Sequence, residues 1–188
     1  SLTHLKKITV RSNETTMLLD SSTIKNLELA KNIRDGTSRG TLLSVLDKTV
    51  TAGGARLMKK WIKEPLLTED IIAKRLDAVD ALHKNVITRE EIISLLQDTY
   101  DLERLISTIN YGNVNPRYLL SLHRSLLQVP PLKEKINILS GELLNQISSM
   151  HDLQETADLI GKAVKEDAPI TIREGGIIKP GYNEELDQ

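Results

Sequence analysis

Apolar residues recur along most of this chain at the three- and four-residue spacing of amphipathic helices. The pattern is strongest from Thr68 onward. One continuous stripe consists of Ile72, Leu76, Val79, Leu82 and Val86. Another, nearer the end of the chain, consists of Leu153, Ala157, Ile160 and Val164. This periodicity predicts a mainly α fold, in which the helices are amphipathic.

Polar residues and prolines mark where the predicted helices begin and end. Thr51 and Thr68 each precede an apolar-periodic segment, and a hydroxyl at this position accepts a hydrogen bond from the first turn. Asn115-Pro116 is typical of a helix start, because Asn caps the helix and Pro lacks only an N–H that has no partner there. Pro130-Pro131 should end that helix and open the next one.

Three other helix starts are predicted from capping chemistry. Asp20 or Ser22 precedes a short helical pattern. The segment Thr88 to Glu91 has the form of a capping box, in which the hydroxyl and the carboxylate satisfy each other's backbone N–H groups. The segment Asp101 to Arg104 clusters charge at a further helix start. We interpret this cluster as a cap together with an ion pair between Arg104 and a neighbour, which holds two helices in register.

Two regions have the character of extended chain. In the first 20 residues, Ile8 and Val10 alternate with polar neighbours. Over residues 169–178, β-branched residues lie on both sides of Gly175-Gly176, a pair that permits a tight reversal. We expect a small hairpin or an extended crossing there, followed by the first turn of a new helix at Asn183.

Residues 42–46 are nearly all apolar, which predicts a short helix that is buried on most sides. The next segment, T-A-G-G-A-R-L-M-K-K-W-I-K-E-P-L from Thr51 to Leu66, has a glycine pair ahead of a basic run. A phosphate-binding P-loop needs Lys and a hydroxyl residue directly after its last glycine, whereas Gly54 is followed by Ala55. We therefore predict a helix that Thr51 caps and Pro65 closes.

This predicted helix has two chemically distinct sides. Its apolar residues, expected to pack inward, are Leu57, Met58, Trp61 and Ile62. Its basic residues, at i, i+3, i+4 and i+7 on the opposite face, are Arg56, Lys59, Lys60 and Lys63. The basic face is interpreted as solvated, and the alternative is a charged interface that meets an acidic partner or DNA phosphates.

Composition limits the classes of function. The chain has 25 Lys and Arg residues against 26 Asp and Glu, so bulk charge does not favour a domain that grips nucleic acid. It has no Cys, which excludes disulfides, thiolate metal sites and cysteine nucleophiles. Its four His residues lack metal-ligand spacing. We predict a non-enzymatic, cytoplasmic helical module with no catalytic residue, cofactor, metal site or membrane span.

Several segments, in order along nearly the whole chain, resemble the core (lever) domain of the MutS family of DNA mismatch-repair proteins. They are Met17-Leu18-Leu19-Asp20, Asn26-Leu27-Glu28-Leu29, Gly40 to Thr49, Gly54 to Leu66, Arg75 to Val79, Asp101 to Arg104, Asn115-Pro116-Arg117 and Arg173 to Asp187. The residues that we expect to be structurally important are Thr51, Gly54, Trp61, Pro65, Asp101, Arg104, Asn115, Pro116, Gly175 and Gly176. Gly53 departs from the family pattern, which has Met before Gly54.

The resemblance implies a multi-helix bundle. Residues 1–20 would end the link from a connector domain, residues 21–182 would be the first part of the core, and residues 183–188 would begin a lever helix toward a clamp domain. It further implies that the core couples mismatched double-stranded DNA, bound by other domains, to an ATPase domain. In the whole protein it implies ATP and Mg, a homodimer and a MutL-type repair partner.

Two alternatives stay open at this point. One is a MutS-family paralogue with a role in recombination, which the core domain alone separates poorly from a repair protein. The other is an unrelated, stand-alone helical scaffold whose face from Arg56 to Lys63 docks an acidic partner protein.

Overall fold

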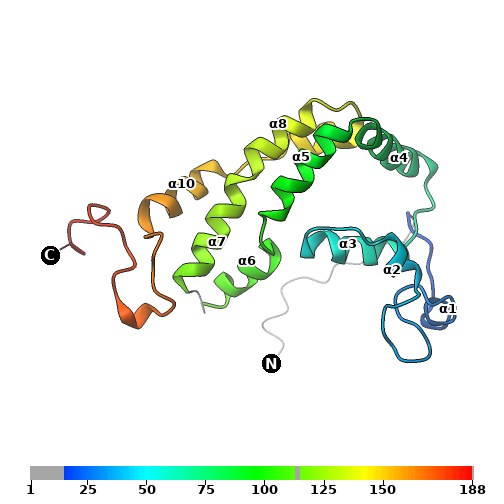
Figure 1. The fold of residues 1–188 in the computed structure, drawn as a ribbon, viewed down its shortest axis with the longest axis horizontal. Helices are drawn as coiled ribbons and strands as arrows, with labels where there is room; N and C mark the ends of the chain where they lie inside the picture. Colours follow the sequence, from blue (N-terminus) through cyan, green and yellow to red (C-terminus); the bar gives the residue numbers. More distant parts are fainter. Residues whose placement is uncertain (1–14, 113–114, 188) are drawn as a thin grey trace, which may run out of the picture. The chain divides into compact units, whose positions relative to one another are not determined.

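The computed structural model describes residues 15–112 and 115–187 of the chain. The described residues are mainly helical, which confirms the predicted fold class (Figure 1). The helices are α1 (Ser21–Asn26), α2 (Leu42–Leu46), α3 (Ala52–Lys63), α4 (Glu69–Lys84), α5 (Val86–Gln97), α6 (Leu102–Asn110), α7 (Pro116–Leu127), α8 (Val129–Asn137), α9 (Glu142–Ser148), α10 (Gln154–Ala163) and the 3-10 helix η1 (Ile172–Glu174).

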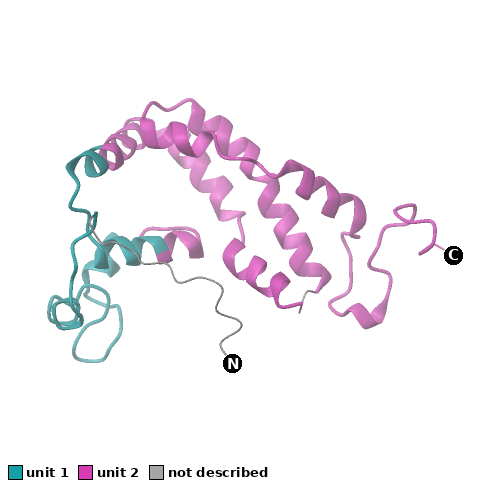
Figure 2. Ribbon diagram, turned by 180° about the vertical axis from the view of Figure 1, so that it is seen from behind, with its two compact units in different colours: residues 1–47, 57–73 teal, residues 48–56, 74–188 magenta. Residues whose placement is uncertain are grey.

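The chain divides into two compact units (Figure 2). Unit 1 comprises residues 1–47 and 57–73, and unit 2 comprises residues 48–56 and 74–188. Helices α3 and α4 therefore each contribute residues to both units. The two units are described separately below.

Unit 2 has a first core cluster where α5 packs against α8, and α8 against α9. Figure 1 shows α5 and α8 running side by side. The buried members of this cluster are Ala78, Ile92, Leu139 and Leu144. Two ion pairs lie at its edge, Lys74 to Glu142 at 3.0 Å and Lys135 to Glu91 at 2.8 Å. The cluster thus joins four helices, since Ala78 comes from α4.

A second core cluster lies where α7 packs against α10. Its buried members are Leu120, Ile160, Val164 and Ala168. The predicted stripe of α10 is confirmed at Ala157, Ile160 and Val164, all of which are buried. Leu153 is exposed instead, because it precedes the first helical residue and adopts a positive φ of 55°.

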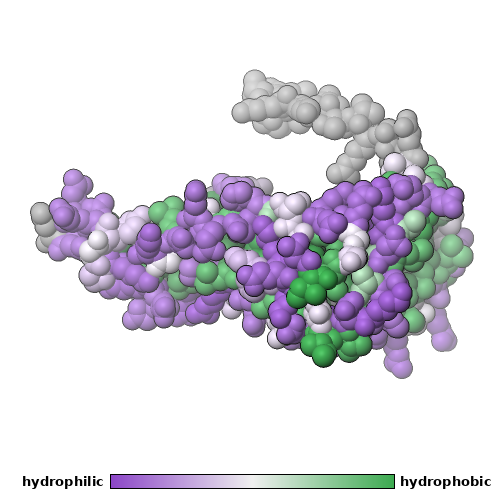
Figure 3. Space-filling model, turned by 90° about the horizontal axis from the view of Figure 1, so that it is seen from above, coloured by the Kyte–Doolittle hydropathy of each residue, from purple (hydrophilic) through white to green (hydrophobic). Residues whose placement is uncertain are grey.

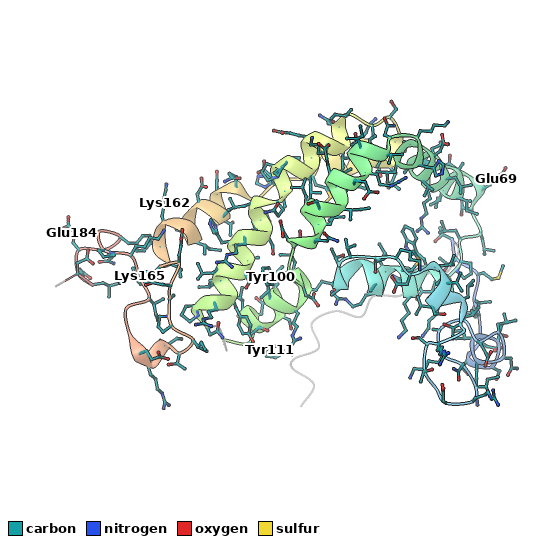
Figure 4. All side chains as sticks on the ribbon, viewed as in Figure 1. Glu69, Tyr100, Tyr111, Lys162, Lys165 and Glu184 are labelled. Atoms are coloured by element: carbon teal, nitrogen blue, oxygen red, sulfur yellow. The ribbon has the colours of Figure 1, made fainter. Side chains whose placement is uncertain are left out.

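The segment that precedes α6 is tied to the C-terminal part of α7 by a buried hydroxyl. Ser125 is 1% exposed, and its Oγ accepts a hydrogen bond from Tyr100 N at 2.9 Å while donating to Ser121 O at 2.8 Å. Figure 4 shows Tyr100 on the segment that leads from α5 into α6. The satisfied hydroxyl fixes this segment against the C-terminal part of α7.

The α4 stripe does not face the first core cluster. Leu76 and Val79 are each 61% exposed. Of the stripe, only Leu82 packs against this cluster, partly buried beside the buried Ala78 and the partly buried Ala81. The side of α4 that packs is therefore centred on Ala78, and Leu76 and Val79 stay exposed.

The junction between α4 and α5 differs from the predicted capping box. Helix α4 ends at Lys84 and α5 begins at Val86, so Asn85 alone joins them. Thr88 consequently lies in the first turn of α5 and does not cap it. The capping-box prediction is wrong because α4 and α5 are nearly continuous, and this leaves no room for a separate cap at Thr88. By contrast, Thr68 O accepts a hydrogen bond from Ile72 N at 3.1 Å, as expected of the residue before α4.

Unit 1 is held together by a short antiparallel pairing. Thr16 and Leu66 form a β-bridge, and Met17 N donates to Pro65 O at 2.7 Å. The described end of the first 20 residues is therefore extended, as predicted. Ile8 and Val10, on which that prediction also rested, lie outside the described residues.

The expectation that α2 is buried is wrong. Leu42, Val45 and Leu46 are 44%, 66% and 47% exposed. The helix is anchored through its cap, because the buried Thr41 donates to Ser38 O and accepts from Ser44 N. Five residues make only about one turn and a half, too short a helix to present a wide apolar face to the rest of unit 1.

Near the end of the chain, a short antiparallel pairing joins residues 163–165 to residues 177–179. Val164 and Ile178 form a bridge, and Lys165 N donates to Ile177 O at 2.9 Å. The intervening residues include η1, and Gly175 and Gly176 after it have positive φ of 70° and 64°. The extended crossing predicted for residues 169–178 is thus a return that pairs with the end of α10.

The surface is mainly hydrophilic on the face drawn in Figure 3, where separate hydrophobic patches interrupt it. In the part of the chain that the structure describes, no helix combines the length and the apolar composition that crossing a membrane requires.

Candidate functional site

The candidate site begins at the N-terminal end of α3, where Thr51 Oγ1 accepts a hydrogen bond from Gly54 N at 3.0 Å. A Cβ at position 54 would lie 2.9 Å from that hydroxyl and 3.3 Å from Thr49 Cβ, so this turn has no room for a side chain. At Gly53 the nearest atom to an added Cβ is 3.9 Å away, on Arg56. Packing therefore requires Gly54 to be glycine, whereas Gly53 has space around it.

Arg56 extends from α3 to the start of α6. Its Nη1 and Nη2 donate to the two carboxylate oxygens of Asp101, both at 2.8 Å, in a bidentate pair. Nη2 also lies 2.6 Å from Glu103 Oε2. Asp101 caps α6 at the same time, since its Oδ1 accepts from Arg104 N at 3.3 Å. The cation that pairs with Asp101 is thus Arg56, which lies 45 residues away. The predicted ion pair between Arg104 and a neighbour does not form among the described residues, and Arg56 joins the two helices instead.

These contacts change the pKa of both partners. Hydrogen bonding from the Arg56 side chain is the main cause that lowers the pKa of Asp101 to about 2, and the Arg104 backbone N–H acts in the same direction. The hydrogen bonds to Asp101 and Glu103 raise the pKa of Arg56 above its ordinary value. Because both side chains remain accessible to solvent, the pair contributes more to geometry than to the free energy of unfolding.

The other three basic residues of α3 have different surroundings. Lys60 Nζ lies 3.9 Å from Glu64 Oε2 on the same helix. Lys59 and Lys63 line a hollow of about 360 Å³ in unit 1. The four basic residues of α3 therefore do not share one set of partners.

The apolar side of α3 is narrower than predicted. Met58 and Ile62, four residues apart, are half-buried, whereas Leu57 and Trp61 are 47% and 38% exposed. The prediction that all four pack inward is wrong for Leu57 and Trp61, because these two lie at the edge of the strip that the helix buries.

Three other residues that were singled out from the sequence, Pro65, Asn115 and Pro116, lie at the ends of helices. Pro65 follows the end of α3, and its carbonyl takes part in the pairing of unit 1. Asn115 Oδ1 accepts from Tyr118 N at 2.9 Å, and Pro116 is the first residue of α7, as predicted.

Two features of the site escaped sequence reasoning. The Arg56–Asp101 pair joins segments whose spacing carries no periodic signal, so only the fold brings them together. Lys25 and Lys31, which line the same hollow as Lys59 and Lys63, are likewise distant from α3 in sequence. The only sequence signal for them is that they are basic residues close to α1.

The arrangement offers an electrostatic link between helices. The carboxylates of Asp101 and Glu103 are both engaged by Arg56, so they are not placed to act as acid or base on a substrate. Over residues 15–112 and 115–187, no group of three or more His, Asp or Glu residues is arranged to hold a metal ion. The contacts of the site therefore support a mechanical role, in which Arg56 holds α3 to α6.

Comparison with known proteins identifies the family. Residues 22–187 match the family model described as MutS domain III. The chain is 44% identical over 189 residues to "DNA mismatch repair protein MutS" of Caldanaerobacter subterraneus subsp. tengcongensis, which covers 100% of this chain and 22% of that protein. It is 45% identical over 188 residues to the protein of the same name from Lachnoclostridium phytofermentans, covering 100% of this chain and 20% of that protein.

An archaeal relative of the same name, from Methanosarcina barkeri, is 40% identical over 192 residues, with 100% of this chain and 21% of that protein covered. The chain thus spans about a fifth of the length of the curated relatives that it matches. The match to the family model covers both units and includes α3, its cap and its ion pair with α6. On these grounds, the chain belongs to the MutS family, in which it corresponds to domain III.

Proposed function

We propose that this chain is the core of a longer DNA mismatch-repair protein, and that it couples the binding of mismatched DNA to ATP hydrolysis in other parts of that protein. The observation that carries the proposal is the match to MutS domain III over residues 22–187. The chain itself has a helical framework and an electrostatic link, and the relatives that it matches are about five times as long.

The link between α3 and α6 supports this role. A bidentate Arg–carboxylate pair holds two helices in a defined orientation, which is what an element that transmits movement requires. In this proposal, ATP and Mg bind elsewhere in the longer protein, mismatched double-stranded DNA is gripped by other domains, and the protein acts as a homodimer with a MutL-type repair partner.

The proposal is tested by breaking the link in the full-length protein. Arg56→Ala should reduce the stimulation of ATP hydrolysis by mismatched DNA by about twofold or more, while basal hydrolysis and mismatch affinity stay unchanged. Lys60→Ala is the matched control, because Lys60 is a basic residue of the same helix whose ion-pair partner lies within that helix. Equal stimulation in Arg56→Ala and in the unaltered protein would contradict coupling through this link.

The 188-residue chain alone provides a second arm of the test. We expect it to bind DNA weakly, without preference for a mismatch, and not to hydrolyse ATP. Tight, mismatch-selective binding by the chain would overturn the proposal. The similarity to mismatch-repair proteins favours repair over the recombination role and over an unrelated scaffold.

A further inference from the structure

A hollow of about 360 Å³ in unit 1 is lined in part by four lysines, the rim lysines. Lys25 belongs to α1, Lys31 follows α1, and Lys59 and Lys63 lie one turn apart on α3. The volume falls within the range of pockets that bind ligands. All of its lining residues belong to unit 1.

The loop that forms one wall of the hollow is ordered by its own hydrogen bonds. Asn32 Nδ2 donates to Arg39 O at 3.0 Å, and Asn32 Oδ1 accepts from Asp35 N at 2.9 Å. Glu28, which has a positive φ of 46°, accepts from Ile33 N through its carboxylate at 2.6 Å. The wall therefore exists before any ligand binds, which lowers the entropic cost of binding.

The same hydrogen bonds occupy the nearby acidic groups. Glu28 serves the backbone of Ile33, and Asp35 accepts from Thr37 N at 2.8 Å. Within the described residues, none of the four rim lysines forms an ion pair, whereas Lys60, Lys74, Lys84 and Lys135 each do. Glu28 and Asp35 keep their negative charges, but the four lysines outnumber these two carboxylates and form no ion pair within the described residues, so the hollow attracts a ligand with several negative charges.

The inner lining selects among such ligands. It includes the apolar side chains of Ile24, Ala30 and Ile33, and none of the lining residues is aromatic. Without an aromatic ring the hollow offers no stacking platform for a nucleobase. A DNA duplex presents phosphates to the lysines, but its apolar groups, such as the thymine methyls, lie within the grooves, away from the phosphates. A peptide that has an apolar side chain among carboxylates matches both the lining and the rim.

We propose that the hollow binds an acidic segment of a separate partner protein, with an apolar side chain inserted between Ile24 and Ile33 and flanking carboxylates paired with the four lysines. This site lies apart from the Arg56 link and does not depend on the coupling role.

The test measures fluorescence anisotropy of a labelled short peptide, a central leucine flanked by glutamates, titrated with the full-length protein. Lys59→Glu should weaken binding by about tenfold. Lys60→Glu is the matched control, since Lys60 is an exposed lysine of the same helix that does not line the hollow, and it should leave the affinity within about twofold. Circular dichroism of each variant establishes that it is folded.

Two further arms test the apolar part. Replacing the leucine of the peptide by serine should weaken binding, and so should Ile33→Ser, which alters a side chain that is already 55% exposed and therefore costs little folding energy. Equal binding of the leucine and serine peptides would overturn the proposal, because charge alone would then explain the affinity. Equal effects of Lys59→Glu and Lys60→Glu would overturn it as well. A third result would also overturn the proposal: the peptide does not bind, but a perfectly paired DNA duplex binds and needs Lys59 to do so. The rim lysines would then form a nucleic-acid contact.

Discussion

The two units of this chain are stabilised in different ways. Unit 2 holds both core clusters, and its helices present buried Leu, Ile, Val and Ala to one another. Among the described residues of unit 1, only Leu29, Ala30 and Thr41 are buried. Unit 1 relies on the pairing of residues 15–17 with residues 65–67, on helix caps, and on loops ordered by side-chain hydrogen bonds.

The difference follows from element length. In unit 2, helices α5, α6, α7, α8 and α10 have nine to twelve residues, long enough for a stripe to meet another stripe, and burial of apolar area then stabilises the fold. Helices α1 and α2 have six and five residues, too few to build a stripe of two turns. Local hydrogen bonds instead fix the backbone of unit 1, and these contribute about 1 kcal/mol each. Substitutions should therefore have unequal effects in the two units.

The largest effect is expected from truncation of a core side chain in unit 2. Leu144 is 4% exposed in the first core cluster, and Leu144→Ala should lower the free energy of unfolding by about 2–5 kcal/mol. Leu46→Ala, at a leucine that is 47% exposed in unit 1, should cost about 0.5 kcal/mol or less. Urea denaturation followed by circular dichroism measures both. Equal losses would show that unit 1 has a core of its own.

A smaller effect is expected from adding one methyl group within the second core cluster region. A Cβ at Gly161 on α10 would lie 2.7 Å from His123 Cε1 on α7. The His123 ring cannot move freely, because its Nδ1 lies in hydrogen-bond contact with Ala157 O at 2.8 Å. Gly161→Ala should therefore destabilise the chain by about 1–3 kcal/mol in the same denaturation experiment.

Gly53→Ala is the matched control for that substitution. Gly53 is also helical, and an added Cβ there meets nothing closer than 3.9 Å. Because Ala restricts the unfolded chain more than Gly does, Gly53→Ala should stabilise the chain by about 0.4–1 kcal/mol. If Gly161→Ala is also stabilising, α7 and α10 do not approach each other as closely as described.

The smallest effect should appear in the pH dependence of stability. The pKa of Asp101 falls from its ordinary value near 3.8 to about 2 in the folded chain, so the folded state favours the ionised carboxylate. Its stabilising contribution is complete above the ordinary pKa and is lost as the pH falls toward 2. The Tm of Asp101→Asn should accordingly lie below that of the unaltered chain at neutral pH, and this gap should close as the pH falls through that window.

Asp80→Asn controls for the general effect of removing a surface carboxylate. Asp80 pairs with Lys84 within α4 and joins no second helix. Its substitution should change Tm less than Asp101→Asn does. A Tm gap for Asp101→Asn that stays constant down to about pH 2 would contradict the assigned role of the ionised carboxylate.

The helix caps and helix starts were predicted correctly because they depend on residues close together in the sequence. Asp20, Thr51 and Asp101 cap helices as expected, because a cap and its N–H partner lie three residues apart. The start of α7 at Asn115-Pro116 was predictable for the same reason. Family membership was also predictable, since the matching segments occur in order along the chain.

Burial and long-range pairing were not predictable in this way. Periodicity shows which residues share a side of a helix, and it does not show which side meets a partner, as Leu76 and Val79 illustrate. The choice of Arg56 over Arg104 as the partner of Asp101 depends on how α3 approaches α6. The roles proposed for Arg56, Lys59 and Lys63 stay predictions until the variants are measured.

Asp101 also has a consequence for the order of folding. Its contact with the Arg104 N–H closes a loop of three residues, whereas its contact with Arg56 closes one of 45. Loop-closure entropy makes the short contact cheap and the long one costly, so the cap should form with the nascent α6 and Arg56 should join it later. The same carboxylate thus first caps α6 and afterwards binds Arg56 of α3. In kinetic terms, Arg56→Ala should mainly accelerate unfolding, while loss of the cap should mainly slow folding.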